Sequence, residues 1–252
     1  MAGAFVQGKF AFIDASSQSS LAVVFDSNVA AASVIAVFIK YGTATSVFSS
    51  ITDSQSNTYN AVDSTTGGVD GANTVKTFYA KNVAAGATTV TLNFTGANGV
   101  FPRIMVLEYS GLDTSASVLN AHEIASQSGV TTGADGVSSA GSAVTTVDGC
   151  TIVGFTVQYQ TPVGATVAGT NFTIRTDGST ATNNFDHVNS EDRIQSTAGS
   201  VHATFTCGGG VGNDYTTAMM AFQVTQSGGL TAIGGSGSSG GGIGTSAVGS
   251  AG

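Results

Sequence analysis

Charge is scarce in this sequence. Only 9% of its 252 residues are Asp, Glu, Lys or Arg, and the 7 Lys and Arg are outnumbered by 15 Asp and Glu, which gives a net charge of -8. Soluble proteins usually carry about 25% charged residues. Seven scattered cations cannot build the basic surface that neutralises phosphates, so we expect no nucleic-acid partner.

Cysteine, proline and tryptophan are also nearly missing, with 2, 2 and 0 residues. Two cysteines are too few for a disulfide framework. Cys150 and Cys207 lie in apolar, strand-like segments. They are expected to be either two buried thiols or a disulfide between neighbouring strands. Two prolines, without a glycine triplet repeat, exclude collagen.

No long apolar segment is present. The longest stretch, Ala30–Ile39, contains Ser33 and has about half the length that crosses a bilayer, so no membrane partner is expected. Met1–Phe10 lacks a cationic segment followed by an apolar one, and we therefore expect no secretory signal. This pattern predicts a protein made in the host cytoplasm that reaches the outside, if at all, by lysis or a non-Sec route.

Short runs of Val, Ile, Thr, Phe and Tyr, separated by Gly, Asn, Asp and Ser, fill most of the chain and predict β-strands. Thr89–Phe94 alternates apolar and polar residues, which is typical of a strand with one wet face. Val34–Ile39 and Ile104–Leu107 are apolar on both faces and should be covered on both sides. Helical periodicity is nearly missing. The fold class is therefore all-β, an antiparallel, jelly-roll-like β-sandwich.

The sequence repeats itself weakly. Val34–Tyr41 resembles Ile152–Tyr159, and Ile104–Leu107 lines up with Ala218–Ala221. Val90, Leu92 and Phe94 match Ala203, Phe205 and Cys207. We expect two similar halves that build a single sandwich over residues 1–226, because no linker separates them. Two tandem sandwiches, each of a size usual for one domain, remain the alternative.

Residues 227–252 differ from the rest, because they are mostly Gly, Ser, Thr and Ala. Such a segment cannot bury enough surface to offset its backbone entropy. We expect this tail to gain order by docking on partner subunits, with four apolar side chains as its anchors: Leu230, Ile233, Ile243 and Val248.

Residues that could carry chemistry do not form a recognisable set, so we expect no enzyme activity, no catalytic residue, no metal and no cofactor. His122 and His202 are expected at the surface and His187 in a loop. Asp53–Asn57 and the pair Asp63 and Asp70 could offer oxygens to Ca²⁺, although Asx turns explain both segments without a metal. Glu108, Glu123 and Glu191 are the glutamates, and an ion pair of Arg103 or Arg193 with one of these acids is favoured over a glycosidase pair.

Three strings carry a resemblance to a known group of proteins: Thr52-Asp53-Ser54 followed by Asn57 and Tyr59, Tyr79–Gly86, and Glu108–Asp113. On these residues the chain resembles β-sandwich modules of tailed-phage virion proteins and of bacterial surface or extracellular proteins. The resemblance spans roughly residues 5–225. It implies an accessory scaffold, and it brings no catalytic residues with it.

The resulting expectation is a non-enzymatic structural protein of a phage virion, a capsid-decoration or head/tail-fibre subunit. Its partners would be other virion proteins of the capsid or tail lattice, together with further copies of itself. The alternative is a carbohydrate-binding or adhesive module at the cell surface. That function would need an exposed row of Tyr or Phe side chains, such as Tyr41, Tyr59, Tyr79, Tyr159 or Tyr215.

Overall fold

The computed structural model describes residues 3–43, 45, 47–68, 71–86, 88–115, 118–130, 135–139, 141–159, 165–178, 186–208 and 213–225. Almost all of them belong to antiparallel strands or to the turns that join them. The expected fold class is therefore confirmed. The tail anchors Leu230, Ile233, Ile243 and Val248 lie outside the described residues.

The first half builds two sheets. Its strands are β1 (Ala4–Phe12), β2 (Ser20–Val24), β3 (Val34–Gly42), β4 (Phe48–Asp53), β5 (Asn60–Gly67), β6 (Asn73–Ala80), β7 (Thr89–Phe94) and β8 (Arg103–Ser110). Five of them form a sheet in the order β1-β8-β3-β6-β5, and three form a smaller sheet in the order β2-β7-β4. Consecutive strands mostly alternate between the two sheets, as they do in a jelly roll.

The second half repeats this arrangement. Its strands are β9 (Leu119–Val130), β10 (Asp135–Ser139), β11 (Ala143–Thr145), β12 (Cys150–Gln158), β13 (Thr166–Ala168), β14 (Thr173–Asp177), β15 (His187–Gln195), β16 (Gly199–Val201), β17 (Thr204–Gly208) and β18 (Asn213–Phe222). The large sheet has the order β9-β18-β12-β15-β14, the smaller one β10-β17-β13, and β11 pairs with β16. Each order matches its counterpart in the first half strand for strand.

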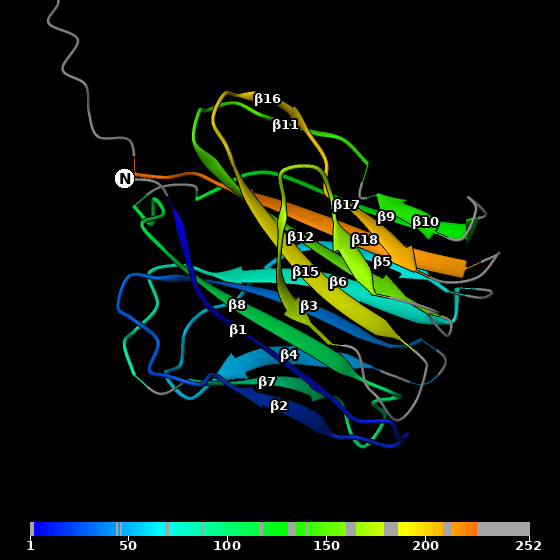
Figure 1. The fold of residues 1–252 in the computed structure, drawn as a ribbon. Helices are drawn as coiled ribbons and strands as arrows, with labels where there is room; N and C mark the ends of the chain where they lie inside the picture. Colours follow the sequence, from blue (N-terminus) through cyan, green and yellow to red (C-terminus); the bar gives the residue numbers. More distant parts are fainter. Residues whose placement is uncertain are drawn as a thin grey trace, which may run out of the picture.

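The sheets stack as four layers (Figure 1), from the β2-β7-β4 sheet at the bottom of the view to β10, β11, β16 and β17 at the top. Three apolar clusters lie between them, and we call them the first outer core, the central core and the second outer core. The central core joins the two large sheets, and at its middle the rings of Phe38 and Phe155 stack with 4.7 Å between centroids. Each half thus closes a two-layer sandwich of its own, and the large sheets of the two sandwiches pack back to back.

The repeat has a different register from the one that the sequence indicates. The sequence alignment equates Ile35 with Val153, yet Ile35 packs in the first outer core and Val153 in the central core. The strand pairs instead equate Phe38, opposite Met105, with Phe155, opposite Ala218. A shift of one residue turns every side chain to the other face of a strand, and in a strand that is apolar on both faces composition cannot reveal that shift.

Candidate functional site

Two cavities lie where the two halves meet. We call one of them the charged cavity; it has a volume of about 440 Å³. Its walls come from both halves and consist of Asp14, Lys40, Asn73, Phe101, Arg103, Tyr159 and Asp186. The sequence analysis did not predict this set, because the residues are far apart in the chain and form no motif.

The charged cavity holds a network of buried ion pairs. Lys40 Nζ in β3 contacts Asp186 Oδ2, which directly precedes β15 of the other half. Arg103 Nη2 contacts Asp14 Oδ1 and lies 3.6 Å from Asp186 Oδ2. Lys40 and Arg103 are each only 2% exposed. Burial is costly for unpaired charges, so the two cations and two carboxylates hold one another in place.

Neighbouring groups complete this network. Arg103 Nη1 donates to the backbone oxygens of Ile13 and Pro102, both at 3.3 Å, and the guanidinium lies 5.2 Å from the centre of the Phe12 ring. Burial lowers the pKa of Lys40, and the adjacent Asp186 charge opposes that shift. The arrangement therefore places a desolvated amine against a carboxyl group.

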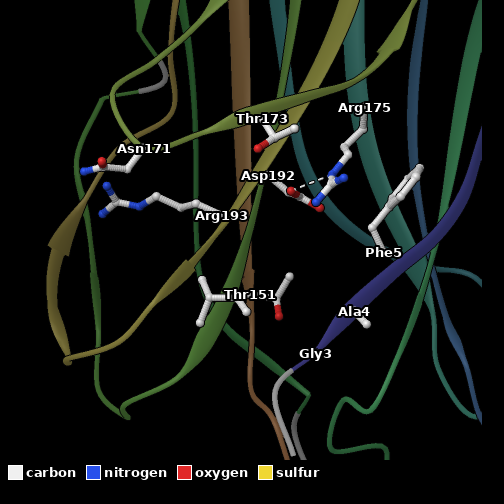
Figure 2. A pocket seen from close by; sticks show the side chains of 10 residues that line it. Gly3, Ala4, Phe5, Thr151, Asn171, Thr173, Arg175, Asp192 and Arg193 are labelled. Atoms are coloured by element: carbon white, nitrogen blue, oxygen red, sulfur yellow. Dashed lines mark hydrogen bonds and ion pairs between the residues drawn. The ribbon is translucent and has the colours of Figure 1, made fainter.

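The second cavity, which we call the β1 cleft, measures about 420 Å³ and lies between the start of β1 and the large sheet of the second half. Figure 2 shows Arg175 turned toward Asp192 and Phe5, with Arg193 on the opposite side of the view. Arg175 Nε donates to Asp192 Oδ1 at 2.7 Å, and its guanidinium lies 4.8 Å from the centre of the Phe5 ring. These contacts pin β1 to the other half, which is a structural task.

The buried glutamates accept hydrogen bonds mainly from backbone groups, whereas the sequence analysis expected an ion pair with an arginine. Arg103 does form ion pairs, but with aspartates. Glu108 Oε1 accepts hydrogen bonds from Ala30 N at 2.9 Å and Ser33 Oγ at 2.8 Å. Glu191 accepts hydrogen bonds from Gly169 N at 2.8 Å and Thr204 N at 3.2 Å, so it ties β17 and the end of β13 to the large sheet.

Glu191 has an unusual protonation equilibrium for a carboxyl group. It is fully buried in the second outer core. Burial raises its pKa to about 8, and the two backbone N–H groups limit that rise. Glu191 itself lines none of the described cavities, and its hydrogen bonds to β17 and to the end of β13 in the smaller sheet indicate a structural clip.

The histidines behave mostly as expected. His122 and His202 are exposed, and His122 Nδ1 lies 2.8 Å from Asp63 Oδ2. His187 is not in a loop: it is the first residue of β15 and half-buried, which lowers its pKa. β15 therefore begins within the segment that the sequence analysis assigned to a loop.

The hydrogen bonds of Asp53 favour an Asx turn over a calcium site. Its Oδ1 accepts hydrogen bonds from the backbone N of Gln55 and of Asn57, and its Oδ2 from Asn57 Nδ2 and Tyr59 Oη. The turn itself therefore uses both carboxylate oxygens. Asp70 lies outside the described residues, and within those that are described no three His, Cys, Asp or Glu side chains gather as metal ligands.

The five tyrosines do not line up on the surface. Tyr41, Tyr159 and Tyr215 are buried. Tyr59 donates to Asp53 Oδ2, and the Tyr79 ring packs edge-on against Phe222. These five tyrosines therefore form no exposed row that could stack on sugar rings.

Cys150 is a free, buried thiol in the second outer core, and burial followed by the nearby Asp148 charge raises its pKa. This is the simpler of the two cysteine expectations. The side chain of Cys207 lies outside the described part of the chain.

Comparisons with known proteins give no name to this architecture. No protein-family model, no curated protein and no solved structure matches the chain. None of the helical segments within the described residues is long and apolar enough to cross a membrane.

Proposed function

We propose that this chain is a non-enzymatic structural protein of a phage virion, a capsid-decoration or head/tail-fibre subunit that acts through protein–protein contacts. Two arguments support the proposal. The first is the resemblance of the strings around Asp53, Lys81 and Glu108 to virion β-sandwich modules. The second is a structural observation, the uncharged character of the two outermost sheet faces.

The outer face of the β2-β7-β4 sheet consists of small, neutral side chains. Val23, Val90 and Leu92 point into the first outer core, so their neighbours along the strands point outward. Those neighbours include Val24, Thr91 and Asn93, and the outer face as a whole is formed by Ser20, Ala22, Val24, Ser50, Thr52, Thr89, Thr91 and Asn93. The opposite end of the molecule is similar, because Thr204, Thr206 and the 58% exposed Val167 alternate with the buried Phe205.

Neutral faces of this kind suit packing against other subunits. Two of the cations, Lys40 and Arg103, are buried, and Lys9 is neutralised at the surface by Asp26 at 2.8 Å. Hydroxyl and amide groups can exchange hydrogen bonds across an interface without the desolvation cost of an ion. The tail of residues 227–252 would add contacts to a neighbouring copy through its apolar anchors.

The proposal is tested on phage particles that are released by lysis of cells carrying the gene for this chain. The chain should co-sediment with the particles and remain bound in moderate salt. Thr91→Glu should weaken the affinity for the particle about tenfold, which corresponds to about 1.4 kcal/mol of binding free energy. Ala97→Glu adds the same charge in the exposed turn between β7 and β8 and should bind as wild type. Absence from the particles, or glycan binding by the isolated monomer, would overturn the proposal.

A further inference from the structure

Lys40 and Asp186 form a buried ion pair that links the two halves of the molecule. They are separated by 146 residues and belong to different halves, yet Nζ and Oδ2 are in direct contact. Their side chains are only 2% and 9% exposed. Both are held by the backbone, because Lys40 pairs with Val75 and Arg103 inside the sheet and Asp186 leads directly into β15.

We propose that Lys40 and Asp186 form an intramolecular isopeptide bond, which joins the two halves of the molecule covalently. This goes beyond an assembly role and does not depend on one. The amine nitrogen already contacts the carboxyl group that it would attack, and β3 and the start of β15 restrict the movement of both residues, so little further ordering is needed.

The reaction is a condensation. A proton first passes from the ammonium group of Lys40 to the carboxylate of Asp186, which gives a neutral amine and a carboxylic acid. The nitrogen lone pair attacks Asp186 Cγ, an N–C bond forms, and a C–O bond breaks. The leaving hydroxyl takes one amine proton and departs as water. No oxidant, reductant or second substrate is consumed.

The surroundings favour each step. Burial lowers the pKa of Lys40, which makes the neutral amine more accessible. Arg103 Nη2, 3.6 Å from Asp186 Oδ2, places positive charge where an oxyanion develops on that carboxyl group. Asp14 lines the same cavity and contacts Arg103, so its negative charge holds the guanidinium beside Asp186. The charged cavity also gives the released water a place to go.

The mass of the intact, denatured protein tests the proposal directly. The bond predicts a mass below that of the linear chain by one water molecule. After trypsin digestion, peptide 10–76 should remain uncut at Lys40 and be joined to peptide 176–193. The full mass of the linear chain, with separate peptides cut at Lys40, would overturn the proposal whether or not any variant folds.

Two variants sharpen this measurement. Asp186→Ala should have the mass of its own linear chain and should be cut by trypsin at Lys40. The two masses are compared for proteins with the same N-terminal processing. Asp186→Asn keeps an electrophilic side chain, so its bond would release ammonia, and its mass should fall by one ammonia in place of one water. Asp14→Asn should slow bond formation at least tenfold in a time course after refolding, because Arg103 loses the charge that holds it beside Asp186. Equal rates would remove Asp14 from the reaction.

Discussion

The two outer cores are built on the same strand order, but they are stabilised differently. In the first half, Val37 in β3 lies opposite Phe78 in β6, and both pack in an entirely apolar cluster. In the second half the corresponding pair is Gly154 in β12 and Glu191 in β15. The missing volume of Gly154 leaves room for the Glu191 side chain, whose carboxylate reaches backbone N–H groups of the smaller sheet.

This difference shows that the jelly-roll order does not require one kind of core. In the first half, buried apolar area attaches the smaller sheet to the larger one, and this stabilisation does not depend on pH. A buried carboxyl group holds that of the second half by directed hydrogen bonds, which depend on its protonation. The two halves should therefore respond differently to mutation and to pH.

The largest effect is expected from Phe78→Ala. Phe78 is 5% exposed and stacks on Phe48 with 5.3 Å between ring centroids, so truncation leaves a cavity in the first outer core. The free energy of unfolding should fall by about 3–5 kcal/mol, measured by urea denaturation. The loss should be equal at pH 5 and pH 8, because burial raises the pKa of Tyr41, an ionisable member of this cluster, above its ordinary 10, and the phenol stays protonated at both pH values. Truncation of the half-exposed Phe101 to Ala serves as the control and should cost less than about 1 kcal/mol.

Glu191 should give the second half a pH dependence. Its pKa of about 8 in the folded protein exceeds the ordinary 4.5, so the folded chain keeps a proton that the unfolded chain releases. Stability from this group is fully present below pH 4.5 and is lost as the pH rises to about 8. The loss should total about 3–5 kcal/mol. Urea midpoints measured at intervals across this range should fall in the wild type.

Glu191→Gln should flatten that fall, because the side chain no longer titrates. The difference between wild type and variant isolates Glu191 from the other ionisable groups. Phe78→Ala provides the matched comparison, since it should retain the wild-type slope. Equal slopes in the wild type and in Glu191→Gln would show that the carboxyl group is ionised normally and that the two cores do not differ in this respect.

The smallest effect is expected from Gly154→Ala. A Cβ atom at this position would lie 2.7 Å from Ala203 Cβ and 2.9 Å from Glu191 Cγ, so the neighbours must shift. Overpacking should cost about 1–3 kcal/mol in the free energy of unfolding. Ala36→Gly in the central core is the comparison variant, because it removes a methyl group where Gly154→Ala adds one. Gly129→Ala would not serve, because the positive φ of Gly129 would strain an alanine. An unchanged stability of Gly154→Ala would mean that the second outer core is loosely packed.

Much of the strand pattern could be predicted from the sequence. Alternation and turn residues located β7, and apolar character on both faces identified β3 and β8 as covered on both sides. Other strands escaped detection. A register shift between Phe48 and Ser50 breaks the alternation of β4, and β13 has only three residues.

The pairing of ionisable groups could not be predicted in the same way. Lys40 and Asp186 carry no local signal, because each looks like an ordinary charged residue at a strand end. Their contact depends on how two sheets dock, and that depends on the fit of whole surfaces rather than on any segment. The same reason explains why the sequence could not show whether the five tyrosines are exposed, and the structure buries three of them.

By itself, the sequence determined that this chain folds into antiparallel strands in two similar halves, because strand formation depends on alternation, turn residues and β-branched side chains that act over a few neighbours. Only the tertiary structure decided that each half closes its own sandwich, that Phe38 meets Phe155 across a central core, and that Lys40 meets Asp186. Those outcomes depend on which apolar face covers which. Alternation along a strand shows which side chains share a face, but it does not show which other sheet covers that face.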